Sequence, residues 1–118
     1  MTVHKMIRER LLQDVIETGE SIPEQELKYN QWCSRFEQLM RNRLIMGACR
    51  YKPLKHGTPN GFDNVNSAIE RLKLYQETGN QEHLVDVANL CLVEFATESH
   101  PNAHFEAQDD GIHTERLK

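Results

Sequence analysis

The chain has 118 residues, about the length of one domain, and 38% of them are hydrophobic. Its net charge of −4, from 14 basic and 18 acidic residues, excludes a globally basic surface, so no nucleic-acid partner is expected. Three cysteines at unrelated spacings argue against a disulfide framework, and no run of about 18 apolar residues could span a membrane. We therefore expect a cytoplasmic protein that has no membrane partner.

The first half of the chain predicts two helices. In residues 3–18, apolar side chains recur every three or four positions, and Gly19 ends this pattern. Ser21 and Glu24 then form a capping-box pattern, which predicts the start of a helix over residues 22–49. The apolar stripe of this second helix comprises Tyr29, Trp32, Phe36, Leu39, Met40 and Leu44.

The second half predicts a loop followed by two further helices. Two prolines and two glycines in residues 51–63 exclude regular structure there. Asp63 is suited to be the N-cap of a helix over residues 64–77, which Gly79 ends. The last predicted helix covers residues 81–97.

These elements predict an all-α fold, because no segment alternates between apolar and polar residues as a half-buried strand does. Their lengths and short connections favour a helical bundle of about four helices. We expect one helical domain over residues 1–100 and a polar C-terminal tail over residues 101–118. The apolar sectors of the last three helices are broader than a three-helix core needs, which predicts a homodimer or a higher homo-oligomer.

The last predicted helix carries a polar stripe between apolar neighbours. Glu82, Asp86 and Asn89 lie at positions i, i+4 and i+7, so all three share one side of the helix. A carboxylate between apolar side chains is costly unless a cation or hydrogen bonds compensate it. Two compensations are open for Asp86: an ion pair with Arg71 or Lys73, or a divalent cation such as Mg²⁺ that it shares with Glu82.

Other charged residues are open to two interpretations. Glu37 lies at the edge of the second helix's stripe and could face the last helix, but it also forms an i,i+4 surface pair with Arg41. Glu70 on the third helix is equally ambiguous. In the loop, Lys52 and Lys55 could contact a phosphate as point charges, or be solvated like most loop lysines.

Three segments together carry a resemblance to a known family: GACRY at 47–51, the Glu70-Arg71 pair, and GNQEHLVDVANL at 79–90. They resemble small phage-encoded members of the MazG-like superfamily, which are all-α nucleoside triphosphate pyrophosphohydrolases. The resemblance covers roughly residues 32–97. It implies an oligomeric, Mg²⁺-dependent enzyme that hydrolyses a (deoxy)nucleoside triphosphate to the monophosphate and pyrophosphate, in the host cytoplasm if the chain is phage-encoded.

The family's pattern can be carried over to this chain only in part. Glu82 and Asp86 match its Glu-plus-Asp element and are the implied catalytic residues, with a carboxylate orienting the attacking water. The earlier helix of the family offers two glutamates three residues apart, whereas here Met40 follows Glu37 at that spacing. The implied metal ligands are Glu37, Glu70, Glu82 and Asp86. The implied substrate-binding residues are Asn89, Arg71, Lys52 and Lys55.

The incomplete acidic set leaves a second hypothesis open. A chain that lacks one ligand of the family's earlier helix could be a non-catalytic phage or prophage helical protein. Such a protein would bind a host protein or a nucleotide without hydrolysing it. The two hypotheses differ in whether another acid approaches Asp86 closely enough to share an ion with it.

Overall fold

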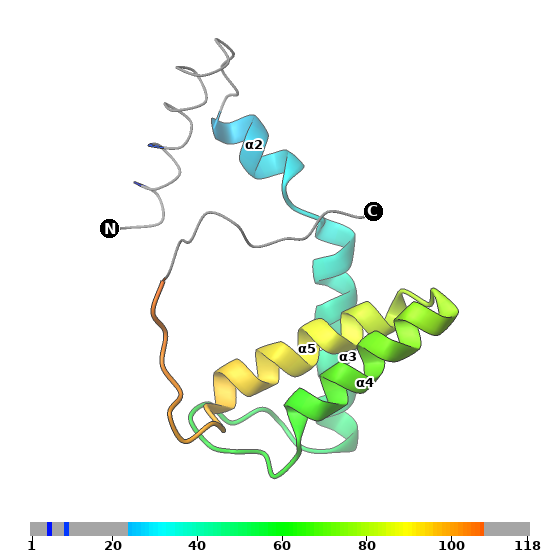
Figure 1. Ribbon diagram of the computed structural model, residues 1–118, viewed down its shortest axis with the longest axis vertical. Helices are drawn as coiled ribbons and strands as arrows, with labels where there is room; N and C mark the ends of the chain where they lie inside the picture. The colour runs from blue at the N-terminus through cyan, green and yellow to red at the C-terminus, as the bar shows by residue number, and fades with distance from the viewer. Residues whose placement is uncertain (1–4, 6–8, 10–23, 108–118) are drawn as a thin grey trace. The chain divides into compact units, whose positions relative to one another are not determined.

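The computed structural model describes residues 5, 9 and 24–107, and all regular structure in them is helical. Its helices are α2 (Glu24–Asn30), α3 (Ser34–Arg50), α4 (Asn64–Thr78) and α5 (Glu82–Thr97), as Figure 1 shows. The predicted all-α fold is therefore confirmed. Apart from Lys5 and Glu9, the helix predicted over residues 3–18 lies outside the described residues. No described helix has the length and apolar character that crossing a membrane requires.

The helix predicted over residues 22–49 is two helices in the structure. Residues 31–33 separate α2 from α3, and the Trp32 N–H donates to the Tyr29 carbonyl at 3.4 Å. Asparagine, tryptophan and cysteine are all weak helix formers, and they follow one another closely at this point. Ser34 then begins a new helix, with Glu37 in its first turn, where an acid suits the helix dipole. The apolar stripe continues across this break, so the periodicity of the sequence predicted one uninterrupted helix.

The chain divides into two compact units, Met1–Gln38 and Leu39–Lys118. The second unit holds most of α3, the whole of α4 and α5, and the loop between α3 and α4. The predicted single domain over residues 1–100 stays a prediction. Of the predicted tail, residues 101–107 are exposed and form no helix, and the remaining residues lie outside the described part.

Helices α4 and α5 form a hairpin with well-defined ends. The Asp63 carboxylate accepts a hydrogen bond from the Asn66 N–H at 3.1 Å, as the predicted N-cap should. This bond, with a second one from the Asn66 side chain, lowers the pKa of Asp63 below its usual value. Gly79 ends α4 with a φ of 70°, and its N–H donates to the Tyr75 carbonyl at 2.8 Å.

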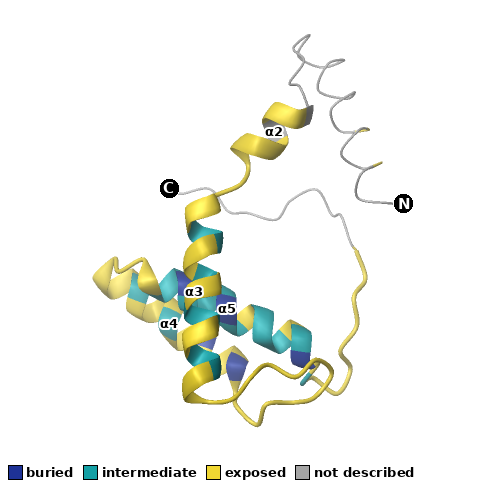
Figure 2. Ribbon diagram, turned by 180° about the vertical axis from the view of Figure 1, so that it is seen from behind, coloured by how far each residue is buried: buried dark blue, intermediate teal, exposed yellow. Residues whose placement is uncertain are grey.

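Helix α3 lies across this hairpin. It passes behind α4 and α5 in Figure 1 and in front of them in the opposite view of Figure 2. The Asn89 side chain on α5 donates to the Met40 carbonyl on α3 at 3.1 Å, which fixes the crossing point. Among the described residues, Ala68 and Val85 are the only hydrophobic side chains that are buried. The core of the second unit is therefore small for its length.

Candidate functional site around Asp86

Asp86 stands where three helices meet. Its side chain, on α5, is only 13% exposed, and each carboxylate oxygen accepts a hydrogen bond from a different arginine. Arg43 on α3 donates from Nε to Oδ1 at 2.8 Å. Arg71 on α4 donates from Nη1 to Oδ2 at 3.2 Å. A shielded carboxylate is thus held by two guanidinium groups that belong to the other two helices.

Arg43 also reaches the second acid of the stripe. Its Nη2 lies 3.0 Å from Glu82 Oε1, so one guanidinium bridges two carboxylates that are one helical turn apart. We call Arg43, Arg71, Glu82 and Asp86 the Asp86 cluster. Its two positive and two negative charges cancel, so the cluster has no net charge with which to attract a phosphate or a metal ion.

Asn89 extends the polar stripe one turn beyond Asp86. Its Nδ2 donates to the Met40 carbonyl, while its Oδ1 is buried with no hydrogen-bond partner. An orphaned buried oxygen is unusual and costs stability. The hydrogen bond to Met40 gives Asn89 a structural role, because it holds α3 against α5. The Oδ1 atom remains able to accept a hydrogen bond beside the cluster.

The arrangement of the cluster does not fit the magnesium ion that the resemblance implies. Mg²⁺ binds carboxylates whose negative charge is not already compensated by other cations, and it dehydrates reluctantly. Both oxygens of Asp86 already accept from arginines, one of which also holds Glu82. In the part of the chain that the structure describes, no three His, Cys, Asp or Glu side chains gather in a group that could hold a metal ion.

The other predicted site residues lie outside this cluster. Glu37 belongs to the N-terminal unit, where its carboxylate accepts a hydrogen bond from Trp32 Nε1 at 3.1 Å. Glu70 is exposed on α4. Lys52 and Lys55 are exposed in the loop before α4. Of the predicted residues, the cluster therefore unites Glu82, Asp86 and Arg71, with Asn89 beside it.

Sequence reasoning missed Arg43, although a signal for it exists. Phe36, Met40, Arg43 and Gly47 follow one another at helical spacing, so Arg43 interrupts an otherwise apolar stripe of α3. A cation in the apolar stripe of one helix and an acid in that of another predict a pair between the two helices. The stripe of α5 predicts an acid that needs a cation, and the stripe of α3 carries the matching cation.

A second polar contact joins the two ends of the hairpin and was also missed. Asn64, at the start of α4, is almost fully buried, and its Nδ2 lies 3.2 Å from both Asn60 Oδ1 and Glu94 Oε1. The loop before α4 is fastened at the same end, since the Gly57 N–H donates to the Ala96 carbonyl at 2.8 Å. Both contacts hold the loop and the hairpin together, and neither brings chemically reactive groups into a cleft.

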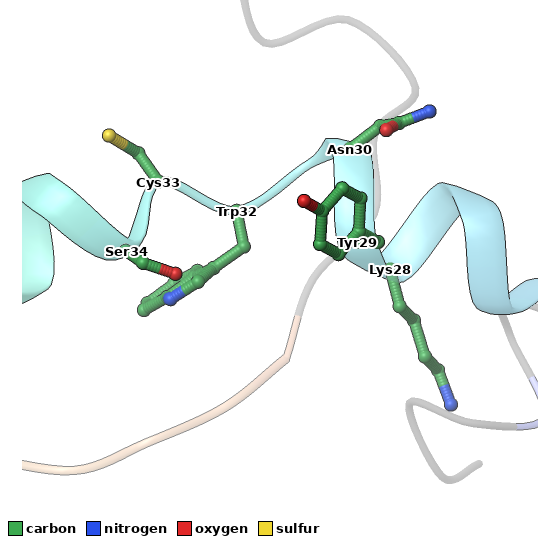
Figure 3. Close-up of a pocket in the computed structure, with 6 residues that line it drawn as sticks. All are labelled: Lys28, Tyr29, Asn30, Trp32, Cys33 and Ser34. Atoms are coloured by element: carbon green, nitrogen blue, oxygen red, sulfur yellow. The ribbon is translucent and has the colours of Figure 1, made fainter.

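A hollow on the surface of the N-terminal unit lies around the break between α2 and α3 (Figure 3). Two aromatic side chains, Tyr29 and Trp32, line it, and both are largely exposed. No residue of the Asp86 cluster lines this hollow. We assign no chemistry to it, because it contains neither a metal-ligating group of residues nor an acid–base pair.

No protein-family model, curated protein or solved structure matches this chain. The MazG-like resemblance thus stays a prediction that rests on the three sequence segments alone.

Proposed function

We propose that this chain is a non-catalytic helical protein that acts by binding another protein. The observation that carries this proposal is the pairing of Asp86 with two cations, since each of its oxygens accepts from a different arginine. A carboxylate holds Mg²⁺ through its negative charge, which the two guanidinium groups beside Asp86 already compensate. Asp86 instead joins three helices, which is a structural task.

The surface supports a binding role as well. Large apolar side chains are exposed on α3, α4 and α5, while the buried hydrophobic core of the described residues consists of Ala68 and Val85. Exposed apolar surface of this extent marks an interface. We propose that the chain self-associates, as a homodimer in the simplest case, and that a host protein is its further partner.

A panel of nucleoside and deoxynucleoside triphosphates tests the absence of catalysis. Each is incubated with the protein and Mg²⁺ or Mn²⁺, and the release of pyrophosphate is measured. We expect no release above the protein-free blank, and no difference between the wild type and Asp86→Asn. Pyrophosphate release that Asp86→Asn abolishes would overturn the proposal.

The Mg²⁺-dependent nucleoside triphosphate pyrophosphohydrolase is the second candidate. One observation favours it, namely the buried Oδ1 of Asn89, an oxygen without a donor one turn from Asp86. For that function, Arg43 and Arg71 would have to leave Asp86 when substrate arrives. The same nucleotide panel decides between the two candidates, because only the hydrolase produces pyrophosphate.

A further inference from the structure

Helix α4 carries an exposed apolar stripe. Val65, Ile69 and Leu72 follow one another at i, i+4 and i+7, and all three are exposed, Ile69 at 45%. Arg71, which reaches Asp86, lies about 160° away from Ile69 around the helix. The stripe is therefore on the side of α4 that points away from the Asp86 cluster.

Helix α5 carries a matching stripe. Ala88, Cys91 and Phe95 share one side at helical spacing; Ala88 is half-buried, Cys91 is exposed, and Phe95 is 73% exposed. Asn89, which bonds to α3, lies about 160° away from Cys91 around the helix. On α4, then, the apolar stripe is opposite the residue that reaches Asp86, and on α5 it is opposite the residue that bonds to α3.

Two cross-helix contacts place these stripes side by side. Asn64 bonds to Glu94, and Arg71 bonds to Asp86, so positions on α4 and α5 whose numbers add up to about 158 are level with each other. Three pairs, whose numbers add up to 160, lie within about one turn of this register: Val65 with Phe95, Ile69 with Cys91, and Leu72 with Ala88. These six residues form one continuous surface, which we call the outer face of the hairpin.

We infer that the outer face docks against the outer face of a second copy of this chain. The inference deepens the proposed self-association and rests on it. Two hairpins stacked in this way form a four-helix layer, with one α3 on each outside. The arrangement is isologous, because the same six residues contribute from both copies.

The area of the outer face suits a stable dimer. At the exposures observed, its large side chains leave on the order of 400 Å² of apolar surface open, within the range of the largest patch on a monomer. Two copies would bury about twice that area. Because roughly 56–65% of an interface is apolar, the total is about 1,300 Å², within the range of specific interfaces.

Two observations favour a second copy over a different protein as the occupant. None of the six residues is charged, so the face offers no charge complementarity to an acidic or basic partner. The buried core of the described residues is small in the single chain, so burying the outer face against a partner would add to its stability. A second copy is present wherever the chain is made, and it covers the face once the chain is concentrated enough to dimerise.

Thiol labelling tests this surface on the unaltered protein. All three cysteines are exposed in the single chain, so Cys49 serves as an internal control for Cys91. We expect a maleimide to modify Cys91 about tenfold more slowly than Cys49 when the protein is concentrated, with the difference vanishing on dilution. Equal rates for both thiols in a protein that light scattering shows to be dimeric would overturn the assignment of this face.

A matched pair of variants tests it independently. Ile69→Glu places a charge at the centre of the outer face, whereas Ile45→Glu makes the same change on α3, where Ile45 is 66% exposed. We expect Ile69→Glu to weaken dimerisation about a hundredfold or more in sedimentation velocity, and Ile45→Glu to leave it unchanged. A dimer that tolerates Ile69→Glu contradicts the inference.

The two proposals fail in distinguishable ways. Pyrophosphate release would overturn the non-catalytic function without affecting the docking surface. A stable monomer at tens of micromolar would overturn self-association and, with it, the docking surface. A dimer with an accessible Cys91 would overturn only the choice of face.

Discussion

The helical position of Asp86 predicts that its carboxylate needs a cationic partner, but not which residues provide it. Its place between apolar neighbours predicted that a cation must compensate it, and Arg71 was one of the two bases considered. The second cation, Arg43, lies on α3, and it precedes Asp86 by 43 positions in the chain. The spacing within one helix predicts the need for a partner, whereas the identity of the partner depends on how helices cross.

Replacing Asp86 with asparagine tests its structural role. Asp86→Asn removes the charge that holds Arg43 and Arg71 together, and we expect it to lower the free energy of unfolding by about 1–3 kcal/mol. The loss stays moderate because both arginine side chains, 40% and 43% exposed, can be hydrated. Thermal melts with and without Mg²⁺ measure the effect. A wild type stabilised by Mg²⁺, with a mutant at least as stable in its absence, would contradict it.

The two arginines should differ in importance. Arg43 contacts both Glu82 and Asp86, whereas Arg71 contacts Asp86 alone among the residues of the cluster. We therefore expect Arg43→Ala to cost about 1–2 kcal/mol of stability and Arg71→Ala under about 1 kcal/mol. Urea denaturation of both variants provides the comparison. If Arg71→Ala proves the more damaging, the bridging role of Arg43 is wrong.

At the scale of the elements, local signals predicted most helix ends. Asp63 and Gly79 bound α4 as predicted, because an N-cap acceptor and a left-handed C-cap are local requirements. The break between α2 and α3 was not predicted, because no glycine or proline marks the end of α2. The apolar stripe from Tyr29 to Phe36 continues through it, so periodicity alone predicted one long helix. Weak helix formers at the break were the signal against continuity.

The N-cap of α4 should give the protein a specific sensitivity to acid. The pKa of Asp63 is lowered from 3.8 in the folded state because the Asn66 N–H and side chain donate to the carboxylate. A lowered folded pKa means that this contribution is present above pH 3.8 and is lost as the pH falls through the folded value. Asp63→Asn keeps an oxygen acceptor but does not titrate.

We accordingly expect wild-type stability to fall more steeply than that of Asp63→Asn as the pH decreases below 3.8. Urea midpoints of both proteins across this range measure the difference. Parallel curves for the two proteins would show that the Asp63 cap does not contribute to the acid transition.

At the scale of the whole molecule, the sequence indicated more apolar surface than the chain can bury by itself, but not which face of the molecule leaves it exposed. Broad apolar sectors on the last three helices predicted self-association, and the small buried core agrees with the surplus of exposed apolar surface. Which face remains open could not be predicted. That depends on the side of the hairpin that α3 covers, and hence on Arg43 and Met40 meeting residues of α5.

A dimer whose folding and association are linked should melt at a temperature that depends on concentration. A hundredfold increase in protein concentration is worth about 2.7 kcal/mol by mass action, enough to raise the midpoint by several degrees. Differential scanning calorimetry over that range measures the shift. A midpoint independent of concentration is the behaviour of a monomer and would contradict the account.

In the proposed function, arginines and not a divalent metal ion neutralise the acids of α5. Titration of the isotope-labelled protein with paramagnetic Mn²⁺, followed by NMR, tests it most directly. A bound Mn²⁺ broadens the amide signals around it, whether or not any reaction occurs. We expect no selective broadening of residues 82–89 at millimolar Mn²⁺. Broadening centred on Glu82 and Asp86, and reversed by Mg²⁺, would contradict the claim.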